Sequence, residues 1–191
     1  MLKKYIDHIE HQSALQILCQ LEQQQQKNNN ILIPPEISSV IKVQPGDCIA
    51  LVGKSASGKT YILSQLVKYS IDQQYHVLYI DLAQQYGSTF SSNTIQNDYI
   101  HIFQPSTNIE LLGIIHGLEK WFYNQNNKIL WVMVDGEWQT TLKQQLLDKI
   151  KILQHYWSFA LVYTSRTFLL DTHDYQFECY KQEQNIRMKL V

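Results

Sequence analysis

The chain has 191 residues, a net charge of −1 at pH 7 and 45% hydrophobic residues. This length and apolar content predict a globular domain with a full hydrophobic core. The near-neutral charge excludes a protein whose whole surface attracts nucleic acid, although it leaves room for a local basic patch. No apolar run approaches the ~20 residues that a membrane-spanning helix needs, so we expect no membrane partner. The three cysteines (Cys19, Cys48 and Cys179) lack the spacing of a metal site and are typical of reduced thiols in an intracellular protein.

Residues 1–30 are expected to form an N-terminal helix and a linker. A modest apolar stripe over residues 3–27 predicts the helix, and a tract of glutamine and asparagine at its end predicts the linker. The stretch Ile-Leu-Ile-Pro-Pro that follows should be extended, because proline disfavours helix in the residue before it. The core domain is expected to span residues 31–191.

Residues 53–60 carry the G-x-x-x-x-G-K-T pattern of a phosphate-binding P-loop, with an apolar strand before it (48–52) and helical apolar spacing after it (61–69). In this context backbone N–H groups and the helix N-terminus bind phosphate, Lys59 reaches the β- and γ-phosphates, and the Thr60 hydroxyl holds Mg²⁺. The alternative is a glycine-rich turn that binds nothing. The candidate nucleotide-binding residues of the loop are Gly53, Lys54, Ser55, Ala56, Ser57, Gly58, Lys59 and Thr60.

The rest of the chain alternates between apolar strands and amphipathic helices. This alternation predicts an α/β fold with a mostly parallel, twisted sheet flanked by helices. Alternating apolar residues at the end of the chain predict an antiparallel hairpin. Thr107 and Glu110 fit a capping box at a helix start, and His101 is expected as a core histidine. The expected strands are residues 76–81, 98–104, 128–135 and 158–165, and the expected helices are residues 107–124 and a segment through 142–153.

Two of the apolar strands end in an aspartate, Asp81 and Asp135. In P-loop proteins such an acid orders Mg²⁺, and the carboxyl ends of the strands are where open α/β sheets bind ligands. We favour Asp135 for this role. Asp81 lies on the strand that directly follows the P-loop helix, where positioning of a base is the commoner use. The alternative for Asp135 is a solvated carboxylate at a strand end.

The order of these segments resembles the RecA-type core of the eukaryotic strand-exchange recombinases and their paralogs. It is most similar to the short, core-only paralogs of the X-ray-repair cross-complementing type, and the similarity covers nearly the whole chain. The residues that carry it are 14–21, Pro45-Gly46-Asp47, the P-loop, 77–81, 101–106, Leu111-Leu112, Asp135 with Trp138, and 160–166.

This resemblance implies a RecA-like P-loop ATPase core with ATP and Mg²⁺ as cofactors. It also implies a nuclear protein that forms a heteromer with another recombinase paralog or a repair factor. Such complexes assist homologous-recombination repair of damaged DNA. Single-stranded DNA would be bound through the complex, and only weakly by this chain alone.

Three departures from the family pattern limit the expected activity. Active recombinases carry a water-activating glutamate two residues after the aspartate of the second strand, and here that position is Ala83. Loss of a positioned general base typically removes about 10²–10⁴-fold in rate, so ATP hydrolysis should be weak or absent. Arg166 replaces a glutamine that senses the γ-phosphate. It would either clamp phosphate or pair with a partner's carboxylate.

The loops that contact DNA in the family are short here. Residues 167–174 contain aspartates but neither lysine nor arginine, although contact with a phosphate backbone needs positive charge. Trp138 would stack on a base, cover the sheet end or meet a partner. Two other functions remain alternatives: a P-loop phosphotransferase for a small molecule, and a scaffold with a vestigial P-loop. The chain's arginines are Arg166 and Arg187, too few for the arginine-bearing lid of a phosphotransferase.

Overall fold

The computed structural model describes residues 42–90, 97–124, 129–137, 140–167, 173–182 and 185–191. The N-terminal helix and linker expected in residues 1–30, and Trp138, lie outside the described residues. The elements in chain order are β1 (Cys48–Val52), α4 (Lys59–Asp72), β2 (His76–Asp81), α5 (Tyr86–Thr89), β3 (Ile100–Phe103), α7 (Asn108–Asn124), β4 (Ile129–Asp135), α8 (Thr140–Trp157), β5 (Ala160–Ser165), β6 (Tyr175–Gln182) and β7 (Asn185–Leu190).

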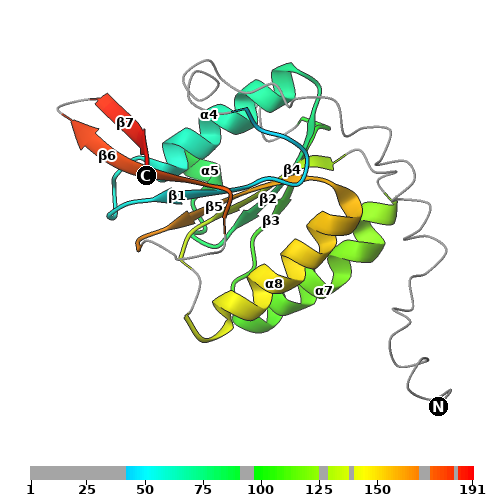
Figure 1. Cartoon of the computed structure of the whole chain (residues 1–191). Helices are drawn as coiled ribbons and strands as arrows, with labels where there is room; N and C mark the ends of the chain where they lie inside the picture. The colour runs from blue at the N-terminus through cyan, green and yellow to red at the C-terminus, as the bar shows by residue number, and fades with distance from the viewer. Residues whose placement is uncertain (1–41, 91–96, 125–128, 138–139, 168–172, 183–184) are drawn as a thin grey trace, which may run out of the picture.

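The strands form a seven-stranded sheet in the order β3-β2-β4-β5-β1-β6-β7. All neighbouring pairs from β3 to β6 are parallel. Strands β6 and β7 form an antiparallel hairpin at one end of the sheet (Figure 1). The α/β fold, the mostly parallel sheet and the C-terminal hairpin predicted from the sequence are therefore confirmed.

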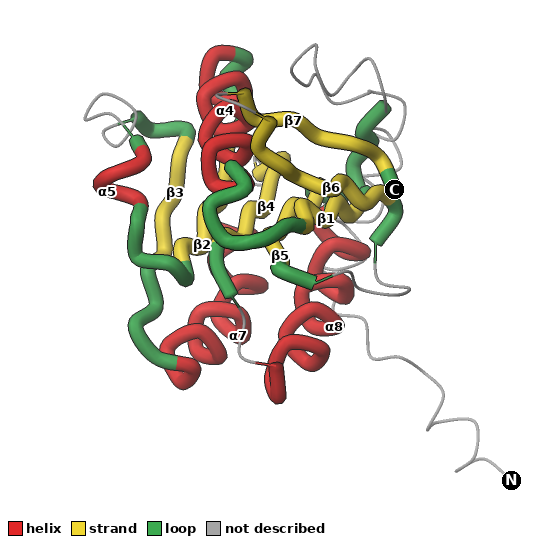
Figure 2. The backbone as a smooth tube through the Cα atoms, turned by 90° about the vertical axis from the view of Figure 1, so that its left-hand side faces the viewer, coloured by secondary structure: helices red, strands yellow, loops and turns green. Residues whose placement is uncertain are grey.

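The two faces of the sheet pack against different helices. Connections β3–α7–β4 and β4–α8–β5 run across the sheet in the direction opposite to β1–α4–β2. Because crossovers between parallel strands are right-handed, opposite directions place the helices on opposite faces. Figures 1 and 2 show this arrangement, with α4 on one side of the sheet and α7 and α8 on the other.

Side chains alternate between these faces along each strand, as the pleat of a strand requires. On β1, Ala50 packs in the cluster that contains α7 and α8, whereas Leu51 packs in the cluster that contains α4. On β4, Val134 packs on the side of α7 and α8, and Met133 packs on the side of α4. The central strands are therefore buried on both sides, which explains their unbroken apolar sequence.

Two strands begin later than the sequence indicated, for local reasons. β3 begins at Ile100 and not at residue 98, because Asn97 accepts hydrogen bonds from the N–H groups of Tyr99 (2.9 Å) and Ile100 (3.2 Å) and closes a turn. β5 begins at residue 160 and not at Ser158, because Ser158 has a φ of 47° where the chain leaves α8. Such left-handed backbone does not continue a strand.

The capping box at the start of α7 is present in a modified form. The N–H of Glu110 donates to Thr107 Oγ1 at 3.2 Å, as predicted. The Glu110 carboxylate reaches back one residue further than expected and accepts from the Ser106 N–H (2.7 Å) and hydroxyl (2.8 Å). These bonds lower the pKa of Glu110, because they favour its charged form.

Candidate functional site

The predicted site residues meet at the carboxyl ends of β1, β2 and β4. The P-loop follows β1, while Asp81 and Asp135 are the last residues of β2 and β4. Strand β5 lies between β1 and β4, and the helices that follow β1 and β4 cover opposite faces of the sheet. This is the place in an open α/β sheet where ligands bind.

Two positions in the P-loop require glycine. Gly58 has a φ of 95°, and a Cβ added there would lie 2.6 Å from the side chain of Ile186 on β7. A Cβ added at Gly53 would lie 2.6 Å from Ser57 Oγ. The N–H of Gly53 donates to the carbonyl of Ser165 at 3.1 Å, which anchors the loop to β5. The loop is therefore shaped by both the hairpin and the central sheet.

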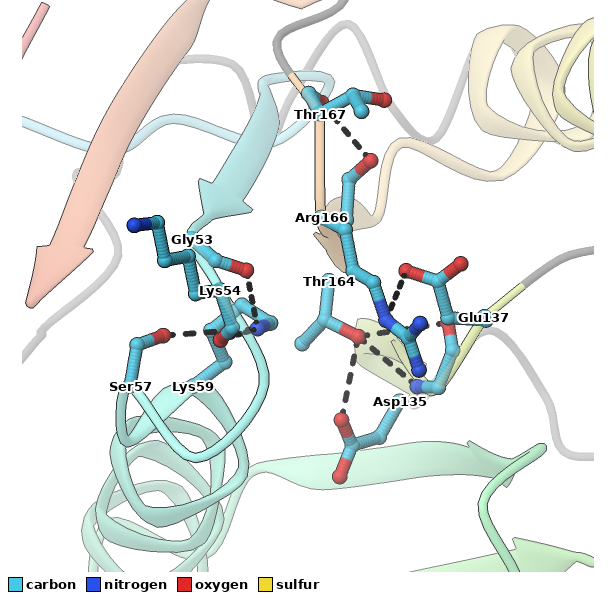
Figure 3. Close-up of polar contacts among 11 residues, drawn as sticks. Gly53, Lys54, Ser57, Lys59, Asp135, Glu137, Thr164, Arg166 and Thr167 are labelled. Atoms are coloured by element: carbon cyan, nitrogen blue, oxygen red, sulfur yellow. Dashed lines mark hydrogen bonds and ion pairs between the residues drawn. The ribbon is translucent and has the colours of Figure 1, made fainter.

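Lys59 is the first residue of α4, and its ammonium group lies inside the curve of the loop (Figure 3). It donates to the carbonyl oxygens of Gly53 (2.6 Å) and Lys54 (2.8 Å) and lies 3.5 Å from Ser57 Oγ. Burial lowers the pKa of Lys59, and the charges of Asp135 and other neighbours oppose this shift. The loop thus holds a cation within a ring of oxygen acceptors. Thr60 follows on α4 and is half-buried.

Asp135 lies across the gap from Lys59, below Thr164 of β5 in Figure 3. It is 2% exposed, and its two oxygens accept from Tyr79 OH (2.9 Å) and Thr164 Oγ1 (3.2 Å). Burial and the neighbouring carboxylate raise the pKa of Tyr79, so its phenol remains a donor. The strand-end position predicted for Asp135 is confirmed. The two hydroxyls that support it, those of Tyr79 and Thr164, were not predicted from the sequence.

Asp81 is the register partner of Asp135 on the neighbouring strand and is 1% exposed. Its Oδ2 accepts from the N–H of Tyr86 and from Nε2 of Gln104, both at 2.8 Å. Its Oδ1 has no hydrogen-bond partner within the described part of the chain. The structure therefore brings both candidate aspartates together as buried neighbours.

Ala83 lies in the turn after β2, packed against the segment that follows Asp135. The N–H of Leu82 donates to the carbonyl of Asp135 at 2.7 Å. Gly136 has a φ of 119°, and a Cβ there would lie 2.8 Å from the Ala83 nitrogen. Ala83 therefore places a methyl group at this position, two residues after Asp81. The next carboxylate along the β4 segment is that of Glu137.

Arg166 forms an ion pair with Glu137, with 3.1 Å between Nε and Oε1. The pair is on the opposite side of Thr164 from Lys59 in Figure 3, and its side chains are 61% and 49% exposed. The two roles expected for Arg166 were a phosphate clamp and a contact with a partner. In the structure its partner is a carboxylate of its own chain, which sequence reasoning did not single out.

The donor set at this site fits a nucleotide with Mg²⁺. Mg²⁺ prefers oxygen ligands, keeps several waters, and is commonly held by one or two carboxylates together with substrate phosphates. Asp81 and Asp135 supply carboxylates, and the P-loop supplies a cradle. One buried oxygen of Asp81 accepts no hydrogen bond from any described residue. Among the described residues no group of three or more histidine, cysteine or acidic side chains is arranged to hold a metal by itself.

Comparison with known proteins adds no family to this geometry. No protein-family model matches the chain, and no curated protein matches its sequence. Across the described residues, no helix has both the length and the apolar character needed to cross a bilayer.

Proposed function

We propose that this chain is an ATP-binding, RecA-like P-loop subunit that hydrolyses ATP slowly or not at all. The observation that carries the proposal is the position of Lys59. Its ammonium group is held by the Gly53 and Lys54 carbonyls inside the loop, across the gap from buried Asp135. A lysine in this place exchanges carbonyl oxygens for the β- and γ-phosphate oxygens when a nucleotide enters.

Each residue of the site has a defined role in this proposal. The N–H groups of the loop and the N-terminus of α4 bind phosphate, and Lys59 neutralises it. The Thr60 hydroxyl and the Asp135 carboxylate hold Mg²⁺. Bound Mg²⁺ supplies positive charge next to the phosphate oxygens. Tyr79 and Thr164 fix the orientation of Asp135 by donating to both of its oxygens.

The expected low turnover has a local reason. Efficient hydrolysis needs a group that orients the attacking water. Ala83 provides none, and the nearby Glu137 is paired with Arg166. Nucleotide binding then has its main effect on conformation and assembly.

The biological context follows from the family resemblance. In this proposal the chain joins another recombinase paralog or a repair factor in the nucleus. The complex assists homologous-recombination repair on single-stranded DNA. The RecA-like assignment is supported by the order of segments, since the strands at 48–52, 76–81, 129–135 and 160–165 occur where the resemblance implies them.

Nucleotide binding is tested with Lys59→Ala and, as a control, Lys68→Ala. Lys68 is an exposed lysine further along α4, whereas Lys59 is the one held inside the loop. Saturating ATP with Mg²⁺ should stabilise the wild type by about 2.7 kcal/mol at a hundredfold excess over Kd. Lys59→Ala should lose most of this stabilisation, and Lys68→Ala should keep it. Absence of any protection of the wild type would favour a scaffold with a vestigial loop.

Assembly is tested by affinity purification of the tagged protein from its native cells, followed by mass spectrometry. Recovery of a recombinase-like chain or a repair factor in near-equal amount would support the heteromer. A lone monomer that transfers phosphate rapidly to a nucleoside or metabolite would instead identify a phosphotransferase.

A further inference from the structure

One buried carboxylate oxygen of the site lacks a protein partner. Asp81 is 1% exposed, and the described residues offer no donor to its Oδ1. Leaving a buried charged acceptor unsatisfied is costly, so native structures rarely do so without a functional reason. The other oxygen of the same group accepts two hydrogen bonds. The carboxylate is therefore fixed in orientation while one oxygen stays available.

The neighbour of Asp81 is a second buried carboxylate. Asp81 and Asp135 are paired in register on β2 and β4. The alternation of the strands puts both on the α4 side of the sheet, together with Tyr79 and Met133. The Tyr79 hydroxyl donates to Asp135 at 2.9 Å, and Asp135 is the register partner of Asp81, so all three groups share one polar cluster.

These paired carboxylates lack a direct cationic partner in the described parts of the chain. The ion pair found there joins Arg166 and Glu137, and it includes neither aspartate. Lys59 is near enough for the charge of Asp135 to affect its pKa, but its donors go to the loop carbonyls. Two adjacent buried anions need a cation or a proton to coexist.

We propose that Asp81 is a second acidic residue of the Mg²⁺–nucleotide site, with its free Oδ1 accepting from the water shell of the cation beside Asp135. The inference rests on the proposed ATP binding and extends it to a residue whose expected use was to position a base. Mg²⁺ retains several waters, so a carboxylate one strand away contributes without direct ligation. Gln104 and the Tyr86 N–H hold Asp81 in place, which makes them positioning groups.

The variant Asp81→Asn separates charge from shape. Its amide oxygen can accept the bonds from Tyr86 and Gln104, and its NH₂ group replaces the unpartnered oxygen. Without Mg²⁺ the variant should therefore unfold at the wild-type temperature or above it. With saturating ATP, the Mg²⁺ concentration that gives half of the thermal protection should rise about ten- to a hundredfold.

The matched control is Asp174→Asn, the same change at the amino ends of β1 and β6, whereas Asp81 lies at the carboxyl end of β2. Asp174 Oδ2 accepts from the N–H of Cys48, the first residue of β1, at 2.7 Å. This variant should keep the wild-type Mg²⁺ dependence. Gln104→Ala is a second probe, which keeps the Asp81 carboxylate but removes one of the two donors to its Oδ2. Because Gln104 is exposed, this truncation should leave the fold intact. It should shift the Mg²⁺ midpoint in the same direction as Asp81→Asn.

The outcomes distinguish this inference from the proposed function. If the wild type shows Mg²⁺-dependent protection by ATP and both Asp81→Asn and Gln104→Ala match it, then Asp81 plays no part in binding the cation and the assignment is wrong. If the wild type shows no protection by ATP at any Mg²⁺ concentration, nucleotide binding itself is wrong. A midpoint shift in Asp81→Asn and Gln104→Ala, without one in Asp174→Asn, supports the second acidic residue.

Discussion

Arg166 and Glu137 form an ion pair, 3.1 Å between Nε and Oε1, at the edge of the site that holds Lys59 and Asp135. Each residue follows a different strand, Glu137 after β4 and Arg166 after β5. The pair therefore places one positive and one negative charge beside the proposed phosphate position. Both charges influence the pKa of Lys59, in opposite directions.

Neutralising the two members of this pair should change ATP affinity in opposite directions. Glu137→Gln removes a negative charge near the phosphates and should tighten ATP binding about three- to tenfold, and Arg166→Ala should weaken it by a similar factor. Binding is measured with a fluorescent ATP analogue at low and high salt, because screening should shrink both effects. The stability of both variants should stay within about 1 kcal/mol of wild type, since the pair is exposed.

Asp72→Asn is the control for this experiment, because Asp72 is an exposed acid at the far end of α4. It should leave ATP affinity unchanged. If Glu137→Gln and Arg166→Ala both weaken binding, the pair acts as one structural unit, and independent action of the two charges is refuted.

Gly58→Ala should destabilise the fold and impair ATP binding. Its φ of 95° is strained for alanine, which costs about 1–3 kcal/mol, and the added methyl would meet Ile186. The free energy of unfolding in urea and the ATP affinity are measured together. Gly113→Ala on α7 is the opposite control, because a Cβ there meets open space. It should stabilise the protein by about 0.5–1 kcal/mol. Equal effects at both glycines would contradict the loop geometry.

Stability should fall with acidification, in part through His101. Burial, followed by the charge of His76, lowers the pKa of His101 from its usual 6.5. As the pH falls through 6.5, the unfolded chain therefore takes up the proton first, and the free energy of unfolding decreases. His101→Gln removes this contribution. The loss of stability between about pH 7.5 and pH 5.5 should be smaller in the variant than in the wild type.

His116→Gln on the exposed side of α7 serves as the comparison for this pH effect. It should retain the wild-type dependence on pH. A His101→Gln protein with the full wild-type loss on acidification would show that groups other than His101 cause the pH dependence.

Cys48 and Cys179 should resist alkylation in the folded protein. Both are 2% exposed, and burial raises the pKa of each thiol to about 12. Since the thiolate is the reactive form, modification by iodoacetamide near pH 8 should be slow until the chain unfolds. Peptide mass spectrometry with and without urea measures both sites. Rapid native labelling of Cys179 alone would show that the hairpin opens away from the loop.

The sheet could be predicted because its strands are buried on both faces. Residues 48–52, 76–81, 129–135 and 160–165 therefore read as apolar runs, and the glycine pattern marks the loop between the first strand and its helix. The later starts of β3 and β5 depend on a turn at Asn97 and a left-handed Ser158. Neither leaves a strong signal in a single sequence.

The supporting residues of the site could not be predicted in the same way. Tyr79, Gln104 and Thr164 act on Asp81 and Asp135 across distances of 23 to 56 residues in sequence, and these contacts exist only once the strand order is known. A polar residue near the carboxyl end of an apolar strand is the signal that could have identified Tyr79 and Thr164. For Glu137, the sequence offers no signal beyond its position two residues after Asp135.

The hairpin that ends the chain is also part of the wall of the P-loop. Ile186 of β7 lies against Gly58, and the backbone of Cys179 on β6 approaches Gly53. The final strands thus buttress the loop from the side opposite to β5. Because Ile186 reaches the loop only through the pairing of β7 with β6, deletion of the last strand should loosen the proposed phosphate cradle while leaving every residue of its sequence motif in place.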